Sequence, residues 1–150
     1  MKVLVVCTAN ICRSPVAAEY LRHLCGVLGV SSVEVTSAGT LGIEGQPADP
    51  IAVRLARVRG LDLSGHRSRG ISADDLTNAD EIVVMERRHR AWIAERAPQA
   101  LSKTILLRGT EGSSSDLVDP TGGTLQDYER VFAQLFESVE RIALGYKYPR

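Results

Sequence analysis

Residues 2–15 read KVLVVCTANICRSP. The run 2–6 is mostly apolar and β-branched, which favours a buried strand. Small and polar residues follow at once, and a helical pattern then runs from residue 14 to about residue 28, with Pro15 in the first turn, where proline is tolerated. The segment therefore predicts a strand, a loop and a helix, with Cys7 at the carboxyl end of the strand.

Strand and helix patterns alternate along the rest of the chain. Further strands are predicted at 33–37, 81–85 and 103–107, and helices at about 50–59, 73–79, 87–96 and 125–144. Such alternation predicts an α/β fold in which a parallel sheet is covered by helices on both faces, a three-layer sandwich. In open parallel sheets, ligands bind beyond the carboxyl ends of the strands, where Cys7 is expected.

Length and charge narrow the class of protein. The 150 residues are 44% hydrophobic and show neither repeat nor linker, so we expect a single domain over 1–150. Eighteen basic residues balance eighteen acidic ones, and this predicts no nucleic acid or membrane partner. The sequence shows neither a signal peptide nor an apolar run of membrane-spanning length. We expect a cytoplasmic protein, with the oligomeric state open and a monomer as the first expectation.

The three cysteines, an odd number, argue against a disulfide scaffold. Their spacing lacks the paired cysteines or histidines of a zinc site, so no metal is predicted. No Gly-Lys-Ser/Thr triplet follows the first strand, which excludes a nucleotide hydrolase of the Walker type. The chemistry expected of the chain needs no cofactor.

Residues 7–14, which we call the cup, place a thiol and a guanidinium six positions apart on one strand-to-helix turn. In such a turn, successive backbone N–H groups and the start of a helix make a concave anion site. Arg13 can hold two phosphate oxygens, and a hydroxyl such as that of Ser14 can stabilise the thiolate of Cys7, which then attacks phosphorus. The predicted phosphate-binding residues are Thr8, Ala9, Asn10, Ile11, Cys12, Arg13 and Ser14.

The Cys7–Arg13 spacing alone is weak evidence for catalysis, because Cys-x5-Arg arises by chance and buried free cysteines are common. A phosphate-binding or flavodoxin-like nucleotide module could use the same amides without a thiol. The preceding strand and Asn10, a residue that tolerates left-handed backbone, favour the catalytic interpretation. The catalytic interpretation also requires an acid that protonates the leaving group.

At these residues the sequence resembles the low-molecular-weight protein tyrosine phosphatases, whose signature is Cys-x5-Arg-Ser near the N-terminus and a late Asp-Pro pair, here Asp119-Pro120. The resemblance extends through residues 37–40, 60–68 and 79–85. It implies a four-stranded parallel sheet, a phosphorylated protein substrate, and a two-step hydrolysis with Cys7, Arg13 and Asp119 as catalytic residues. Asp116 is a rival for the acid, and Asp119 could instead be a turn starter.

The same resemblance assigns supporting roles. Asn10, Ser14, Ser37 and His66 look like the hydrogen-bonded set that holds the cup rigid. Cys12 could form a protective disulfide with an oxidised Cys7, or simply fill the core. The remaining cysteine and histidines, Cys25, His23 and His89, are interpreted as ordinary helix residues.

The residues that indicate which substrate the site accepts disagree with one another. Thr121-Gly122-Gly123 lacks the aromatic wall of many tyrosine phosphatases, and residues 112–123 with Tyr128 look more like the protein arginine phosphatase branch, although that branch carries Phe after Asp-Pro. Ile11 is typical of tyrosine-specific members, where arginine phosphatases have Thr. We expect phosphotyrosine, with phosphoarginine as the alternative. An arsenate reductase would need further cysteines late in the chain.

Overall fold

The computed structural model describes residues 1–109 and 116–149. Residues 112–115, which contribute to the resemblance to the arginine phosphatase branch, lie outside the described part. The strands are β1 (Lys2–Cys7), β2 (Glu34–Gly39), β3 (Glu81–Val84) and β4 (Thr104–Leu106). The helices are α1 (Arg13–Val27), α2 (Pro50–Val58), α3 (Ala73–Asn78), α4 (Arg87–Arg96), the 3-10 helix η1 (Pro98–Lys103) and α5 (Leu125–Lys147).

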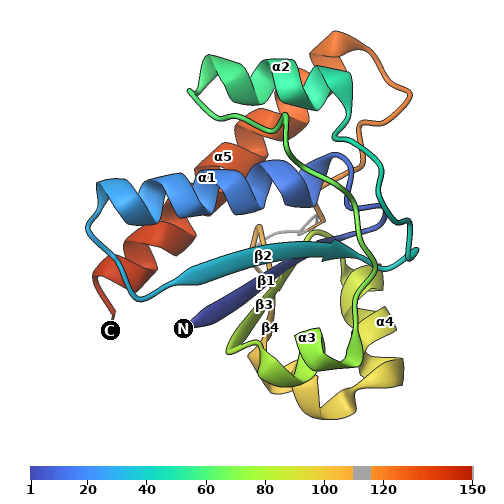
Figure 1. Ribbon diagram of the computed structural model, residues 1–150, viewed down its shortest axis with the longest axis vertical. Helices are drawn as coiled ribbons and strands as arrows, with labels where there is room; N and C mark the ends of the chain where they lie inside the picture. Colours follow the sequence, from blue (N-terminus) through green and yellow to red (C-terminus); the bar gives the residue numbers. More distant parts are fainter. Residues whose placement is uncertain (110–115, 150) are drawn as a thin grey trace.

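The four strands form one parallel sheet in the order β2-β1-β3-β4 (Figure 1). β1 is central, and its register places Cys7 opposite Gly39 of β2 and Val6 opposite Val84 of β3. All strands therefore end at the same edge of the sheet. The predicted parallel sheet is confirmed, and the cup begins at that edge.

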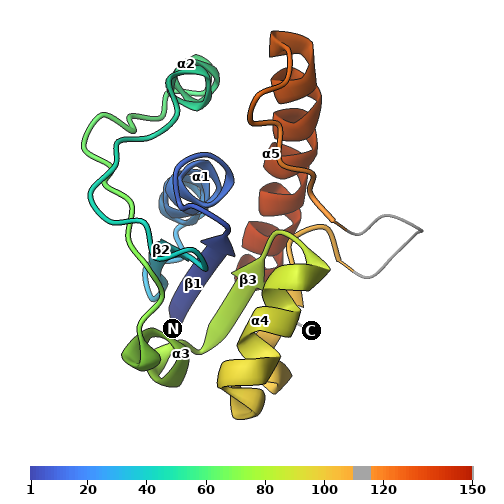
Figure 2. The ribbon, with the colours of Figure 1, turned by 90° about the vertical axis from the view of Figure 1, so that its right-hand side faces the viewer.

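Helices cover both faces of the sheet, with α1, α2 and α5 on one side and α3 and α4 on the other (Figures 1 and 2). Alternate residues of β1 point to opposite faces of the sheet. Val3 and Val5 pack with α1 and α5, whereas Leu4 and Val6 pack on the face covered by α3 and α4. All four side chains are at most 2% exposed. This burial on both faces explains why the strand reads as a continuous apolar run.

Side-chain caps set several helix starts where the sequence predicts them. Asp49 accepts hydrogen bonds from the first turn of α2, and Thr124 forms a capping box with Asp127 at the start of α5. The helix η1, a 3-10 helix that begins at Pro98, was not predicted. No helix in the described ranges is long and apolar enough to cross a membrane.

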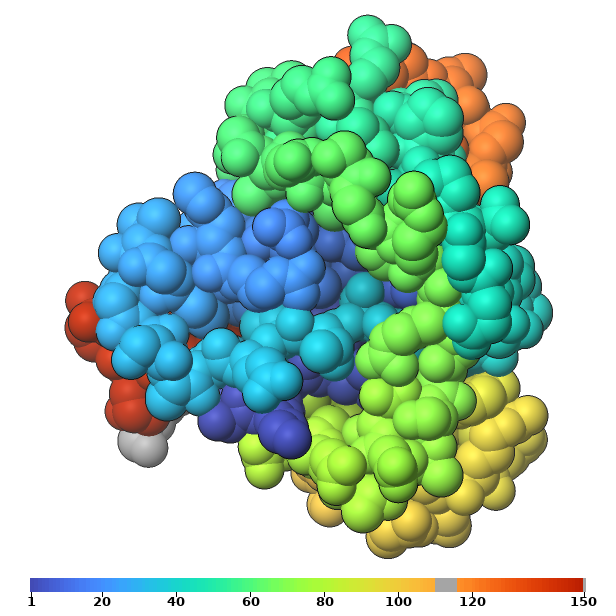
Figure 3. All heavy atoms as spheres, in the orientation of Figure 1, coloured from blue at the N-terminus to red at the C-terminus, as the bar shows by residue number. Residues whose placement is uncertain are grey.

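The segment that follows α2 runs over the carboxyl end of β2 before it reaches α3 (Figure 3). Gly39 N–H donates to Arg69 O at 2.9 Å, and Ile71 N–H donates to Gly39 O at 3.2 Å. These bonds tie the segment to the edge of the sheet at the point where the cup lies. Residues far from the cup in sequence are thereby brought against it.

Candidate active site

The backbone N–H groups of the cup are available to a ligand. Among the described residues, none accepts a hydrogen bond from a backbone N–H of residues 8–14. The last two of these residues, Arg13 and Ser14, open α1, whose positive end therefore faces the same place. Consecutive N–H groups without a protein acceptor at a helix start form an anion-binding nest.

Cys7 sits at the base of this nest, only 2% exposed, with its Sγ 3.0 Å from Ser14 Oγ. Asn10 Nδ2 donates to the same Ser14 oxygen at 2.8 Å. When Cys7 is a thiolate it has no proton to give, so the Ser14 hydroxyl is the donor of this hydrogen bond. A hydrogen bond to sulfur stabilises the thiolate over the thiol.

Asn10 holds the shape of the cup. It is fully buried and has a left-handed φ of 60°, which asparagine tolerates better than most residues. Its Oδ1 accepts from Arg69 N–H at 3.1 Å, which fixes the orientation of the amide, and its Nδ2 donates to Ser37 Oγ at 2.9 Å. His66 Nε2 must carry a proton, since it lies 2.7 Å from the carbonyl oxygen of Asn10. The structure thus places Ser37 and His66 against the cup.

Gly39 closes the opposite side of the cup. A Cβ added there would lie 2.6 Å from Thr8 O and 2.8 Å from both Ala9 C and Asn10 N. These are backbone atoms of the cup, and they cannot move aside as a flexible side chain would. Only glycine allows β2 and the cup to approach this closely.

A second chain of contacts links the cup to α5. Asp49 N–H donates to Ile11 O at 2.9 Å, and Asp49 Oδ2 accepts from the Tyr128 hydroxyl at 2.8 Å. Burial, together with this hydrogen bond to Asp49, raises the pKa of Tyr128 to about 12. Tyr128 therefore acts as a neutral hydrogen-bond donor that positions Asp49 under Ile11.

Arg13 forms one wall of the site and is almost completely buried. Its Nη1 donates to Glu86 Oε2 at 2.8 Å and to Leu117 O at 2.6 Å, and these two bonds fix the plane of the guanidinium. Nη2 lies 3.8 Å from Asp119 Oδ2. The structure therefore brings the predicted Arg13 and Asp119 together, although they are far apart in sequence.

The sequence interpretation missed the residues that follow β3. Glu86 Oε2 binds Arg13 and also accepts from Arg88 at 2.9 Å. Burial opposes its ionisation, but hydrogen bonds from Arg88 and Arg13 hold the pKa of Glu86 below its ordinary value. A signal was present in the sequence, because Glu86 directly follows a predicted strand, and the carboxyl ends of parallel strands meet at the same sheet edge as Cys7.

His89, interpreted from sequence as an ordinary helix residue, is buried beside the cup. Its Nδ1 accepts from Glu86 N–H at 3.1 Å, so the proton sits on Nε2, which donates to Thr8 Oγ1 at 2.8 Å. Burial, assisted by the charge of Arg13, lowers the pKa of His89 to about 4. A neutral imidazole thus holds the Thr8 side chain, which also accepts from Arg88 Nη2 at 2.9 Å.

Asp119 and its rival Asp116 have different surroundings. Asp119 is partly exposed, and although burial opposes it, hydrogen bonds from Thr121 and the charges of Arg13 and Arg88 lower its pKa. Asp116 accepts instead from the backbone N–H of Arg87 at 2.8 Å, at the start of α4. The structure places Asp119, not Asp116, beside Arg13.

The remaining cysteines lie in the core. Cys12 is 6% exposed, and burial, with the nearby charge of Asp49, raises its pKa. Burial also raises the pKa of Cys25 on α1. In the described ranges, no group of three or more His, Cys, Asp or Glu side chains is arranged to hold a metal ion.

Residues 2–146 match the model of a family described as low molecular weight phosphotyrosine protein phosphatase. The low molecular weight protein-tyrosine-phosphatase Etp of Escherichia coli (strain K12) is 36% identical over 133 residues, which cover 89% of this chain and 86% of Etp. The protein-arginine-phosphatase of Geobacillus stearothermophilus is 33% identical over 143 residues, which cover 95% of this chain and 93% of that protein.

One solved structure, of a mutant of the YwlE arginine phosphatase with a phosphorylated active-site serine, superposes with a TM-score of 0.90. It is 28% identical, and the match covers 100% of this chain and 98% of the other. Sequence and structure comparisons therefore agree over the whole chain.

Proposed function

The chain belongs to the low molecular weight phosphotyrosine protein phosphatase family, and from this premise we propose that it hydrolyses phosphotyrosine in proteins through a phosphocysteine at Cys7. The observation that carries the proposal is the ring of backbone N–H groups at residues 8–14, which have no acceptor in the described part of the chain and follow directly on a buried sulfur. Arg13 completes the ring with a fixed guanidinium. Such a site suits a phosphoryl group with three equatorial oxygens.

In the first step, the Cys7 thiolate attacks phosphorus and the bond to the phenolic oxygen breaks. Asp119 gives its proton to that oxygen, so neutral tyrosine leaves. The carboxyl group has a lowered pKa in the free protein, yet a phosphate dianion bound beside it opposes its negative charge and raises its pKa. Substrate binding therefore supplies the acid that the step needs.

In the second step, the Asp119 carboxylate takes a proton from water as the water oxygen attacks phosphocysteine. Inorganic phosphate leaves and the Cys7 thiolate is restored, again stabilised by Ser14 at 3.0 Å. The similar YwlE mutant carries a phosphoryl group on a serine of its active site, which supports a covalent intermediate in this fold.

Two features of the site mouth favour phosphotyrosine over phosphoarginine. Aliphatic side chains of Ile11, Leu41 and Val118 belong to the segments around the cup, and the last two are 64% and 59% exposed, so they can contact a phenyl ring. Arg88 is held 2.9 Å from Thr8 and repels a second guanidinium. The 33% identity to a protein-arginine-phosphatase keeps phosphoarginine as the second candidate.

Two further proposals concern the setting of the enzyme. We propose that residues 1–150 act as one domain in the cytoplasm, where the three free cysteines stay reduced. Cys12 lies in the same cup as Cys7 and would trap its oxidised form as a disulfide.

The test is phosphate release from two peptides that differ only in carrying phosphotyrosine or phosphoarginine, assayed with reductant and without added metal. We expect faster release from phosphotyrosine, loss of it in Cys7→Ser, and a gain for phosphoarginine in Ile11→Thr and Arg88→Ala. A preference for phosphoarginine in the parent protein would show that the substrate assignment is wrong. Release that survives Cys7→Ser would remove the covalent mechanism.

A further inference from the structure

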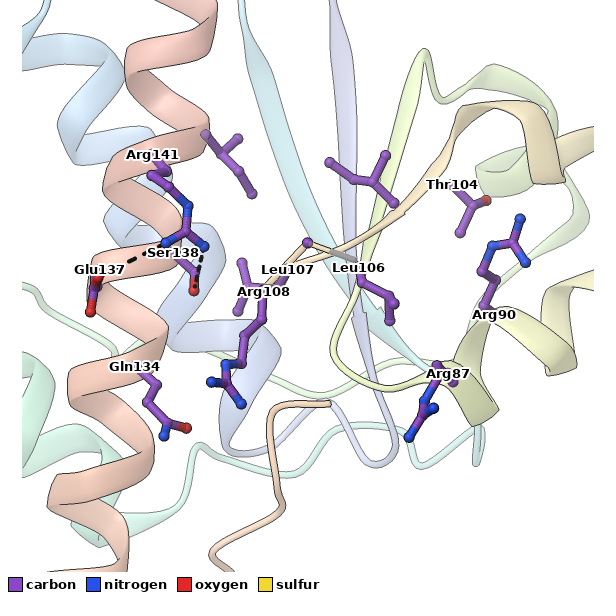
Figure 4. Close-up of a pocket in the computed structure, with 13 residues that line it drawn as sticks. Arg87, Arg90, Thr104, Leu106, Leu107, Arg108, Gln134, Glu137, Ser138 and Arg141 are labelled. Atoms are coloured by element: carbon purple, nitrogen blue, oxygen red, sulfur yellow. Dashed lines mark hydrogen bonds and ion pairs between the residues drawn. The ribbon is translucent and has the colours of Figure 1, made fainter. Parts of the chain in front are cut away.

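A groove of about 1010 Å³ lies apart from the cup, along the outer edge of the sheet. β4 and the turn after it form its floor, α5 forms one wall, and the start of α4 forms the other (Figure 4). None of residues 7–14 lines it. Its volume is at the upper end of the range for ligand sites and is sufficient for a short peptide.

The floor combines apolar side chains with an open strand edge. Within the described residues, β4 pairs only with β3, so its other side faces the groove. Leu107 N–H donates to Val84 O at 2.8 Å, and because alternate residues of a strand bond in opposite directions, the N–H of Leu106 points away from β3. Ile105 on the same strand is 39% exposed. A strand edge with apolar neighbours can receive an extended peptide.

The walls are strongly basic, although the chain as a whole is neutral. The side chain of Arg90 has no hydrogen-bond or ion-pair partner within the described part of the chain, and Arg141 is 4.0 Å from Glu137. Glu137 is the one acidic side chain among the described lining residues, against four arginines, Arg87, Arg90, Arg108 and Arg141. Arg87 already pairs with Asp116 at 3.3 Å, so the positive charge open to an anionic occupant is that of Arg90 and Arg141.

We propose that this groove binds an extended acidic segment of a partner protein. Arg90 and Arg141 pair with its carboxylates, the Leu106 N–H donates to a backbone carbonyl oxygen of the segment, and the apolar floor receives alternate side chains. A single-stranded nucleic acid fits less well, because such strands stack on aromatic side chains and none of the described lining residues is aromatic. The inference does not depend on which phosphorylated residue the cup accepts.

The probe is a fluorescein-labelled octapeptide of alternating aspartate and valine, with an asparagine-valine counterpart of the same shape. Binding is followed by fluorescence anisotropy on the full chain. We expect saturable binding of the aspartate peptide only, weakening as salt rises, and about fivefold weaker in each of Arg90→Glu and Arg141→Glu. The matched control is Arg54→Glu on the exposed side of α2, which should bind as the parent does.

Each other outcome overturns the proposal. Equal binding of the asparagine peptide would remove the role of charge, and equal weakening by Arg54→Glu would show a non-specific effect. Displacement by saturating inorganic phosphate would locate the peptide at the cup. Tighter binding of an oligouridylate, lost in the same two variants, would make the partner a nucleic acid. Thermal unfolding and phosphate release of each variant verify that it is folded.

Discussion

Replacing Gly39 by alanine should damage the cup without touching a catalytic group. The added Cβ would lie 2.6 Å from Thr8 O, about 0.8 Å short of an ordinary contact, which begins at 3.4 Å. Ala9 C and Asn10 N lie within 2.8 Å, so the backbone of the cup has to shift as a unit. Overpacking of this kind costs about 1 to 3 kcal/mol of unfolding free energy.

The effect on catalysis should be larger than the effect on stability. A shift of several tenths of an ångström misaligns the N–H groups with the phosphoryl oxygens, and misplacement by about 1 Å costs about 100-fold in rate. We expect kcat/KM for the phosphotyrosine peptide to fall by about 100-fold, mainly in kcat. Urea unfolding and initial rates of phosphate release measure the two quantities.

Gly26→Ala is the matched control. Gly26 lies within α1, and a Cβ there meets nothing within 4 Å. Alanine should stabilise the helix by about 0.5 to 1 kcal/mol and leave kcat unchanged. A Gly39→Ala variant with the parent's kcat and stability would refute the reasoning that the close approach of β2 shapes the cup.

Three further predictions follow from the contacts around the cup. Asn10→Ala should lower the unfolding free energy, measured with urea, by about 3 kcal/mol, because it leaves buried hydrogen-bonding groups unpaired and puts alanine in a left-handed backbone conformation. Asn10→Gly should lower it less, because glycine adopts that conformation without strain. The pKa of His89 lies at about 4 in the folded protein against an ordinary 6.5, so unfolded chains take up a proton first as pH falls. The unfolding free energy should therefore decrease by up to about 3 kcal/mol between pH 6.5 and 4, and His89→Gln should lack this slope. Peroxide oxidises Cys7 to a sulfenic acid, and the Cys12 thiol converts this to a disulfide with release of water. After long exposure to peroxide, dithiothreitol should therefore restore the phosphatase activity of the parent protein but not that of Cys12→Ser.

Much of the fold could be predicted from sequence because its signals are local. The apolar run of residues 2–6 and the caps at Asp49 and Thr124 specify elements without any long-range information. The ends of the helices and strands differ from the predicted ends where tertiary contacts determine them. The first strand includes Cys7, because its pairing with Gly39 extends the ladder by one residue beyond the predicted end.

The active site could be predicted from sequence only in part, because some of its residues come together through long-range contacts. Cys7 and Arg13 lie in one short motif, so their spacing alone suggests a cup. Glu86 and His89 reach the cup through the order of strands, since β3 is the neighbour of β1 although 70 or more residues separate them in sequence. Sequence periodicity describes an element's own face and says nothing about which strand lies beside it.

The central claim is that the phosphoryl group passes through Cys7, and trapping that intermediate tests it most directly. p-Nitrophenyl phosphate, whose leaving group needs no proton donor in the first step, is mixed with Asp119→Asn protein, in which the second step lacks its base. The reaction is quenched within one turnover for intact-mass and peptide-mapping mass spectrometry. The account predicts one added phosphoryl group per chain, on the peptide that contains Cys7. Release of phosphate at the parent rate, with no adduct at any time point, would contradict it.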